Sequence, residues 1–151
     1  MSSPSPSVLI IEARFYDDIS DELAEGAIAE LTSSGVAYER VAVPGALEIP
    51  VAFAMAVSRG VVGPAAKHQG VIALGCVIRG ETSHYDIVAN ESARGLMQLG
   101  VDHAIPVGNG ILTVDSRAQA DARASIEGKN KGKGAAAACL ALMELSAGWS
   151  G

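Results

Sequence analysis

The chain has 151 residues and a net charge of −6, and no basic block appears before the lysines near residue 130, so nucleic acid is not an expected partner. No apolar run approaches the length that spans a lipid bilayer, so no membrane partner is expected either. The two cysteines, Cys76 and Cys139, stand in apolar contexts, which favours a reducing cytoplasmic location over a secreted disulfide framework.

Strand and helix patterns alternate along the chain after a start that is rich in Pro and Ser. Residues 1–7 are predicted to be disordered, lack the basic patch and apolar core of a signal peptide, and precede a single domain at residues 8–151. In chain order, the predicted elements are a strand at 8–13, a helix at 17–34, a strand at 38–43, a helix at 47–59, a strand at 71–78, a helix at 84–99, a strand at 104–107, a turn at 108–110, an extended piece at 111–114, a helix at 116–126, a loop at 128–134 and a helix at 135–147.

The alternation of strands and helices predicts an α/β fold. Parallel strands joined by helical crossovers form a sheet that is covered on both faces, so we expect a three-layer sandwich around a four-stranded, mainly parallel sheet. Ligands of such sheets bind beyond the carboxyl ends of the strands. The segments at these ends are residues 14–16, 45–48, 79–84 and 108–110, and they hold the unusual residues of the sequence. This coincidence predicts a binding site at one edge of the sheet.

The stretch GVIALGCVIRGETSHYD, residues 70–86, combines a buried strand with a polar turn. Its apolar run ends at RGETSH, where a helical pattern begins. Backbone N–H groups of the GETS turn can hold an anion with help from the Thr82 hydroxyl, and His84 beside them can carry protons. The alternative for this turn is an ordinary helix start capped by Thr82 or Ser83.

Each of the other candidates has two interpretations. Phe15 in a polar loop can stack on a planar heterocycle, or it forms a hydrophobic lid over the first helix. Glu48 can accept hydrogen bonds from ligand hydroxyls, or it is an acidic residue in a first helical turn, where the helix dipole favours it. Arg123 and the GKNKGKG loop can bind phosphate, or the loop is solvated and flexible. No group of residues has the spacing of a metal site.

Taken together, these segments resemble the lumazine synthase family. The matching pieces are ARF, PGALEIP, ALGCVIRGETSHYD, PVGNGILTV, and QADARA followed by EGKNKG, in family order from about residue 8 to the end of the chain. The resemblance implies a flavodoxin-like sheet. It also implies a transferase of riboflavin biosynthesis that condenses 5-amino-6-(D-ribitylamino)uracil with 3,4-dihydroxy-2-butanone 4-phosphate. The implied products are 6,7-dimethyl-8-ribityllumazine, phosphate and water, and neither a cofactor nor a metal is implied.

The resemblance also implies roles for individual residues. Phe15 is implied to stack on the pyrimidine ring, Glu48 to hold the ribityl chain and His84 to move protons. The other implied contacts, to the pyrimidine and to the phosphate, are at Ala46, Leu47, Val77, Ile78, Glu81 and Thr82. The residues implied to reach the site from a neighbouring subunit of a homopentamer are Asn109, Arg123 and Lys131. A monomer would then hold only part of the phosphate site.

Three positions depart from the family pattern. Tyr16 replaces a common asparagine, Asn109 stands where many members carry phenylalanine, and Gly134 occupies a position that is often acidic. The departures at Asn109 and Gly134 leave a second function open, a module that binds a flavin or lumazine without turnover. A third possibility is a scaffold with a vestigial site. Some members assemble pentamers into a hollow shell. The segment before the first strand is short and contains Pro4 and Pro6, which suit strand pairing poorly, so an isolated pentamer is expected here.

Overall fold

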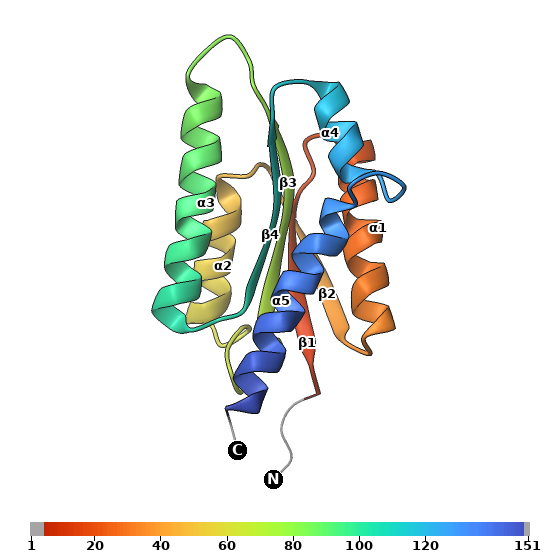
Figure 1. The fold of residues 1–151 in the computed structure, drawn as a ribbon. Helices are drawn as coiled ribbons and strands as arrows, with labels where there is room; N and C mark the ends of the chain where they lie inside the picture. Colours follow the sequence, from red (N-terminus) through yellow and green to blue (C-terminus); the bar gives the residue numbers. More distant parts are fainter. Residues whose placement is uncertain (1–4, 150–151) are drawn as a thin grey trace.

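Four parallel strands form the centre of the computed structural model, which describes residues 5–149 (Figure 1). The strands are β1 (Ser7–Ala13), β2 (Ala37–Val43), β3 (Gly70–Ile78) and β4 (Val107–Val114). Their order across the sheet is β2-β1-β3-β4. The chain thus adds β2 on one side of β1 and then β3 and β4 on the other. The carboxyl ends of β1 and β3 therefore form the topological switch point, where sheets of this kind bind ligands.

Helices cover both faces of the sheet, which confirms the expected three-layer α/β sandwich of flavodoxin-like form (Figure 1). One layer contains α1 (Asp17–Ser33), α4 (Arg117–Ala124) and α5 (Lys131–Gly148), and the other contains α2 (Glu48–Ser58) and α3 (His84–His103). Within residues 5–149, no helix has both the length and the apolar character needed to cross a membrane.

The central strand β1 supplies side chains to both cores. Val8 and Ile10 pack with the layer of α1, α4 and α5, whereas Leu9 and Ile11 pack with the layer of α2 and α3. Successive strand residues point to opposite faces of a sheet. An unbroken apolar run such as residues 8–11 therefore buries both faces, as parallel strands between two helical layers require.

The predicted interruption of the last strand is wrong. β4 is continuous and pairs with β3 along its length, whereas the sequence predicts a strand at 104–107, a turn at 108–110 and a separate extended piece at 111–114. Gly108 lies inside the strand because α5 approaches it closely. A Cβ atom at Gly108 would lie 1.9 Å from the carbonyl oxygen of Ala135. The glycine that suggests a turn therefore permits close packing of a helix on a strand.

The helices α3 and α4 end elsewhere than predicted. α3 passes Gly100 and ends at His103, where Ala104 takes a left-handed backbone conformation (φ 53°) that is more usual for glycine. The N–H of Ile105 donates to the carbonyl oxygen of Gly100 (3.0 Å), so Gly100 belongs to the closing turn and does not stop the helix. α4 ends at Ala124, short of its predicted end, because the next residue is extended (φ −57°, ψ 132°).

Helix α5 begins inside the predicted loop at residues 128–134. Its amino-terminal cap is Asn130, which has a left-handed backbone conformation (φ 47°) and whose side-chain oxygen accepts a hydrogen bond from the Lys133 N–H (3.4 Å). Gly132 then packs against α1, since a Cβ atom there would lie 2.0 Å from the carbonyl oxygen of Leu23. This contact between helices, which the local sequence does not reveal, makes part of the glycine- and lysine-rich segment helical.

The amino-terminal end of β1 is joined to the neighbouring elements by hydrogen bonds. β1 begins at Ser7, so this residue lies in the sheet and not in a disordered segment; residues 1–4 lie outside the described part. The Ser7 hydroxyl lies 2.8 Å from Nδ1 of His68, and Nε2 of His68 lies 3.0 Å from a Glu39 carboxylate oxygen. Because the His68 ring is buried and both of its nitrogens have partners, this histidine is structural.

Candidate active site

Loops at the carboxyl ends of β1, β2 and β3 bring most of the predicted site residues to one edge of the sheet (Figure 1). Phe15 follows β1, the turn at 45–48 follows β2, and the turn at 79–83 follows β3. β1 pairs with both β2 and β3, so the three loops leave adjacent parallel strands. Val77 and Ile78 are the last residues of β3 and are half-buried. Three of the four predicted segments therefore lie at this edge, whereas residues 108–110 lie inside β4, near its amino-terminal end.

Phe15 presents its ring to solvent. Its exposed fraction is 74%, which is too large for a hydrophobic lid over α1. Its ring contacts that of Tyr16 edge to face, with centroids 4.9 Å apart and planes at 74°. An exposed aromatic face at the carboxyl end of a central strand suits stacking on a planar heterocycle.

The turn between β2 and α2 carries Ala46, Leu47 and Glu48. Ala46 is buried, Leu47 is partly exposed, and Glu48 is the exposed first residue of α2. A Cβ atom on Gly45 would lie 3.2 Å from a Glu48 carboxylate oxygen, so this carboxylate lies over the backbone of its own turn. The helix dipole stabilises an acidic group at this position, and its exposure leaves it able to accept hydrogen bonds from a ligand.

The turn between β3 and α3 offers free backbone donors. The N–H groups of Gly80, Glu81 and Thr82 have no hydrogen-bond acceptor among residues 5–149. The Thr82 hydroxyl accepts a hydrogen bond from the His84 N–H (3.3 Å), whereas the Ser83 side chain makes no cap bond. Thr82 thus caps the start of α3, as the alternative interpretation expects. The N–H groups of Gly80, Glu81 and Thr82 nevertheless remain unpaired beside it. Because helix starts with free N–H groups favour negative charge, the turn can hold an anion.

Arg79 holds this turn from its amino-terminal side. Its Nε donates to Asp115 (3.0 Å), and its guanidinium lies 3.6 Å from Asp86 and 4.2 Å from the centroid of the Tyr85 ring. These partners come from the segment after β4 and from the first turn of α3. Arg79 therefore pairs with carboxylates, and His84 remains exposed at the start of α3.

A second group of predicted residues lies around another pocket. Asn109, Arg123 and Lys131 come from β4, α4 and α5, and they line one cavity of about 420 Å³ together with Gly134. Residues of the β1, β2 and β3 loops do not line it. The structure thus brings these three together and separates them from the first group.

This second pocket carries unpaired positive charge. Within residues 5–149, no carboxylate forms an ion pair with Arg123 or Lys131. The half-buried Arg123 donates through Nη1 to the carbonyl oxygen of Gln119 (3.1 Å), which orients the guanidinium and leaves donors free. The side-chain oxygen of Asn109 accepts a hydrogen bond from Ile111 N–H (2.9 Å). A guanidinium and an ammonium with no carboxylate between them form a suitable site for an anionic oxygen group.

The cysteines are poorly suited to nucleophilic chemistry. Burial raises the pKa of Cys76 to about 11 and the pKa of Cys139 to about 12. Both thiols therefore remain protonated near neutral pH, where the thiolate is the reactive form. Within residues 5–149, no group of His, Cys, Asp and Glu is arranged to hold a metal ion.

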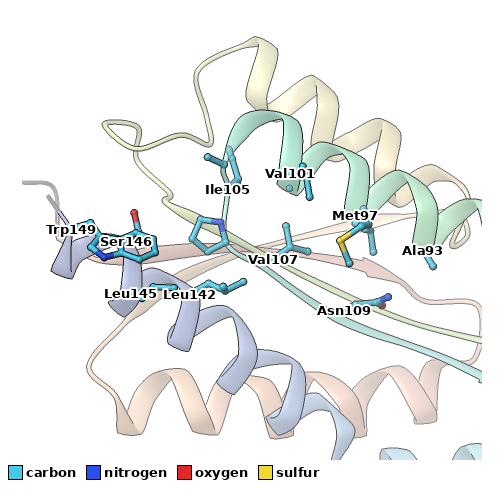
Figure 2. A pocket seen from close by; sticks show the side chains of 14 residues that line it. Ala93, Met97, Val101, Ile105, Val107, Asn109, Leu142, Leu145, Ser146 and Trp149 are labelled. Atoms are coloured by element: carbon cyan, nitrogen blue, oxygen red, sulfur yellow. The ribbon is translucent and has the colours of Figure 1, made fainter.

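An apolar groove between α3 and α5 is the feature that the sequence interpretation missed. The groove has a volume of about 440 Å³ and crosses the exposed edge strand β4 (Figure 2). Its most exposed apolar side chains are Met97, Val101 and Trp149. The i, i+4 spacing of Met97 and Val101 on the outer face of α3 is the signal that predicts such a surface. Asn109 lines both this groove and the cationic pocket, so the two surfaces are continuous.

Comparison with known proteins decides the family. The sequence model of the family described as 6,7-dimethyl-8-ribityllumazine synthase matches residues 5–147. The chain belongs to this family. A 6,7-dimethyl-8-ribityllumazine synthase of Agrobacterium fabrum is 53% identical over 140 residues, covering 93% of this chain and 94% of the relative. A synthase of the same name from Xanthobacter autotrophicus is 55% identical over 139 residues, with 91% and 83% coverage, and one from Methylobacterium radiotolerans is 50% identical over 152 residues, with 95% and 89% coverage.

The lumazine synthase match includes both groups of candidate residues. It extends beyond Phe15 at one end and beyond Lys131 at the other. The two surfaces, one with free backbone donors and an exposed aromatic ring and one with unpaired cations, therefore belong to a single family domain.

Proposed function

We propose that this chain condenses 5-amino-6-(D-ribitylamino)uracil with 3,4-dihydroxy-2-butanone 4-phosphate and releases 6,7-dimethyl-8-ribityllumazine, phosphate and water. Membership of the 6,7-dimethyl-8-ribityllumazine synthase family is the observation that carries the proposal, and it makes the chain a transferase of riboflavin biosynthesis. The proposed reaction uses no cofactor. Two free cysteines, of which Cys139 is buried and Cys76 is partly buried, support a cytoplasmic location.

The pyrimidine is proposed to bind at the carboxyl ends of β1, β2 and β3. Its ring stacks on the exposed face of Phe15 and packs against Val77 and Ile78. Its ribityl hydroxyls donate to the Glu48 carboxylate, and the backbone of Ala46 and Leu47 lies at the same turn. An apolar platform with a few polar groups at its rim is the usual form of a site for a planar ligand.

The phosphate is proposed to bind between the free N–H groups of Glu81 and Thr82 and the unpaired cations Arg123 and Lys131. The positive charge of these groups complements the negative charge of the phosphate, and their N–H donors match its oxygen atoms. Holding both substrates in a reactive arrangement lowers the barrier by up to about 7–11 kcal/mol, since the translational entropy is lost on binding.

The chemistry then needs only proton transfers from the protein. The substrate amine attacks the ketone carbon, a C–N bond forms, and the oxygen leaves as water. Elimination of phosphate then leaves an enol that becomes a second ketone. The ribitylamino nitrogen attacks this ketone carbon, and its oxygen leaves as a second water when the ring closes. His84 follows the turn whose free N–H groups are proposed to bind the phosphate. Its side chain is exposed and has no partner among residues 5–149, so it can carry these protons. A well-placed acid/base group contributes about 10²–10⁴-fold in rate.

A complete site is proposed to form between two copies of this chain in a homopentamer. The cationic pocket and the turns that follow β1 to β3 are separate surfaces of one chain, which suits head-to-tail contacts that close into a ring. The apolar groove is continuous with the cationic pocket through Asn109, and an exposed apolar surface of this kind favours a protein interface. Burial of the groove would bring another copy next to Arg123 and Lys131. We propose an isolated ring.

The synthase assay tests the proposal directly. Purified protein that receives both substrates and no added cofactor is expected to release a fluorescent lumazine and inorganic phosphate in equal amounts. Absence of product with authentic substrates would overturn the enzyme assignment. Tight binding of flavin or lumazine without turnover would identify a binding module. Large particles in sedimentation that bind neither ligand would identify a scaffold.

Replacing His84 tests its role as the proton carrier. We expect His84→Ala to lower kcat by about 10²-fold, with KM for either substrate changed little, because the imidazole acts on protons and contributes little to binding. His103→Ala is the matched control, since this exposed histidine lies at the opposite end of the same helix. Steady-state kinetics of both variants decide the point. An unchanged kcat for His84→Ala would remove this residue from the mechanism.

A further inference from the structure

The ring of Phe15 is exposed, yet one neighbour limits its orientation. Its aromatic contact is the edge-to-face pair with Tyr16, whose centroid lies 4.9 Å away. An exposed phenylalanine otherwise exchanges among several side-chain rotamers. Contact with a fixed ring on one side disfavours the rotamers that would break the pair, so the orientation of Phe15 depends on whether Tyr16 itself is fixed.

Tyr16 is held from several directions. Its ring is half-buried and packs against the core formed by α1, α4 and α5. Its carbonyl oxygen accepts the first hydrogen bond of α1, from the N–H of Ser20 (2.9 Å). The guanidinium of Arg117 lies 6.0 Å from the centre of the Tyr16 ring and pairs with Asp18 and Asp121. Tyr16 therefore connects the exposed side chain of Phe15 to the core.

The backbone on the other side of Phe15 is also fixed. The Arg14 guanidinium donates to the buried Glu12 carboxylate (2.9 Å) and to Asp21, and lies 3.6 Å from Asp17. The turn at residues 14–16 is thus bound both to β1 and to the first turns of α1. Because its backbone cannot easily move, the remaining freedom of Phe15 is that of its own side chain, and Tyr16 is the residue placed to reduce it.

We propose that Tyr16 is a positioning residue, whose ring holds Phe15 in the orientation that stacks on the pyrimidine substrate. The inference rests on the proposed function, in which Phe15 forms the stacking platform. A ring that is already oriented loses less conformational freedom when the substrate binds, so the effect falls on affinity for the pyrimidine. The butanone phosphate binds elsewhere, and its affinity is expected to be unaffected.

Three variants at this position test the proposal. Tyr16→Leu is expected to raise KM for the pyrimidine about three- to tenfold, with kcat and KM for the butanone phosphate near their wild-type values. Tyr16→Phe retains the ring and is expected to restore wild-type KM. Tyr16→Met, an unbranched side chain that fills the core without a ring, is expected to behave like the leucine variant and serves if that variant folds poorly. Thermal unfolding checks that each protein is folded.

Controls separate this inference from the proposed function. Tyr38→Leu removes another partly exposed tyrosine, on β2, and is expected to leave KM unchanged. Phe15→Ala is expected to raise KM for the pyrimidine at least as much as Tyr16→Leu does. If folded Tyr16→Leu or Tyr16→Met has the wild-type KM while Phe15→Ala is impaired, the positioning role of Tyr16 is overturned and the proposed function stands. The same holds for an equal defect in Tyr16→Phe. A wild-type protein without turnover would instead overturn the proposed function.

Discussion

Co-expression of a His84→Ala chain with an Arg123→Met chain is expected to restore synthase activity to about one quarter of the wild-type value, because a ring of head-to-tail contacts joins unlike surfaces of neighbouring chains. Each variant alone is expected to be strongly impaired. Arg123→Met removes a charge-assisted donor to the phosphate, which costs about 10- to 100-fold in kcat/KM for the butanone phosphate.

The recovery follows from the separation of the two surfaces. His84 stands at the turn after β3, whereas Arg123 and Lys131 line the pocket beside β4 and α5. In a randomly mixed ring, a site is intact when an Arg123→Met chain supplies the histidine side and a His84→Ala chain supplies the cationic side. About one site in four meets this condition. Activity per oligomer, measured after purification through two different tags, gives the fraction.

The matched control combines two variants that alter the same surface. Each site takes both Arg123 and Lys131 from one chain, and every chain in a mixed ring of Arg123→Met and Lys131→Met carries one of the two substitutions. Every site therefore keeps one defect on its cationic side. No recovery above the separate variants is therefore expected. Lack of recovery for the His84 and Arg123 pair, in oligomers that contain both chains, would show that each chain forms its own complete site.

Substitution of Gly132 by alanine is expected to destabilise the fold by about 3 kcal/mol, since the added methyl group would meet the backbone of α1 and not a movable side chain. A Cβ atom there would lie 2.0 Å from the carbonyl oxygen of Leu23 and 3.0 Å from its Cα. Either α5 must move away from α1 or the start of α5 must unwind. Urea unfolding at a fixed protein concentration measures the change, because assembly also contributes to stability.

Gly134 supplies the control in the same helix. A Cβ atom at Gly134 meets nothing within 4 Å, so Gly134→Ala adds only helix propensity. Its expected effect is a gain of about 0.5–1 kcal/mol, opposite in sign to that of Gly132→Ala. Equal stabilities for the two variants would contradict the close contact between α1 and α5.

Local sequence determined the elements wherever one physical signal dominated. The apolar runs at residues 8–11 and 71–74 produced the two central strands, because a strand buried between two helical layers is apolar on both faces. The turn after β3 could also be predicted from the local sequence. An apolar run that stops at RGETSH predicts a strand end, a helix start and free N–H groups, and these are local properties of the backbone.

Glycine was the residue that local reasoning interpreted least well. Gly108 and Gly132 suggest a turn and a loop, yet they lie inside β4 and α5. In each case the missing side chain admits the backbone of another element, namely α5 at Gly108 and α1 at Gly132. A glycine that provides backbone freedom and a glycine that provides space look identical in one sequence, and only the neighbouring element distinguishes them.

The sequence by itself determined the alternation of strands and helices, the family motifs and the edge of the sheet where most of the candidate site residues lie, since periodicity and turn chemistry act over a few residues. The tertiary structure decided the strand order β2-β1-β3-β4, the gathering of Asn109, Arg123 and Lys131 around one pocket, and the apolar groove beside it. These features join residues from different elements. Their positions depend on how whole helices pack on the sheet, and no local pattern carries that information.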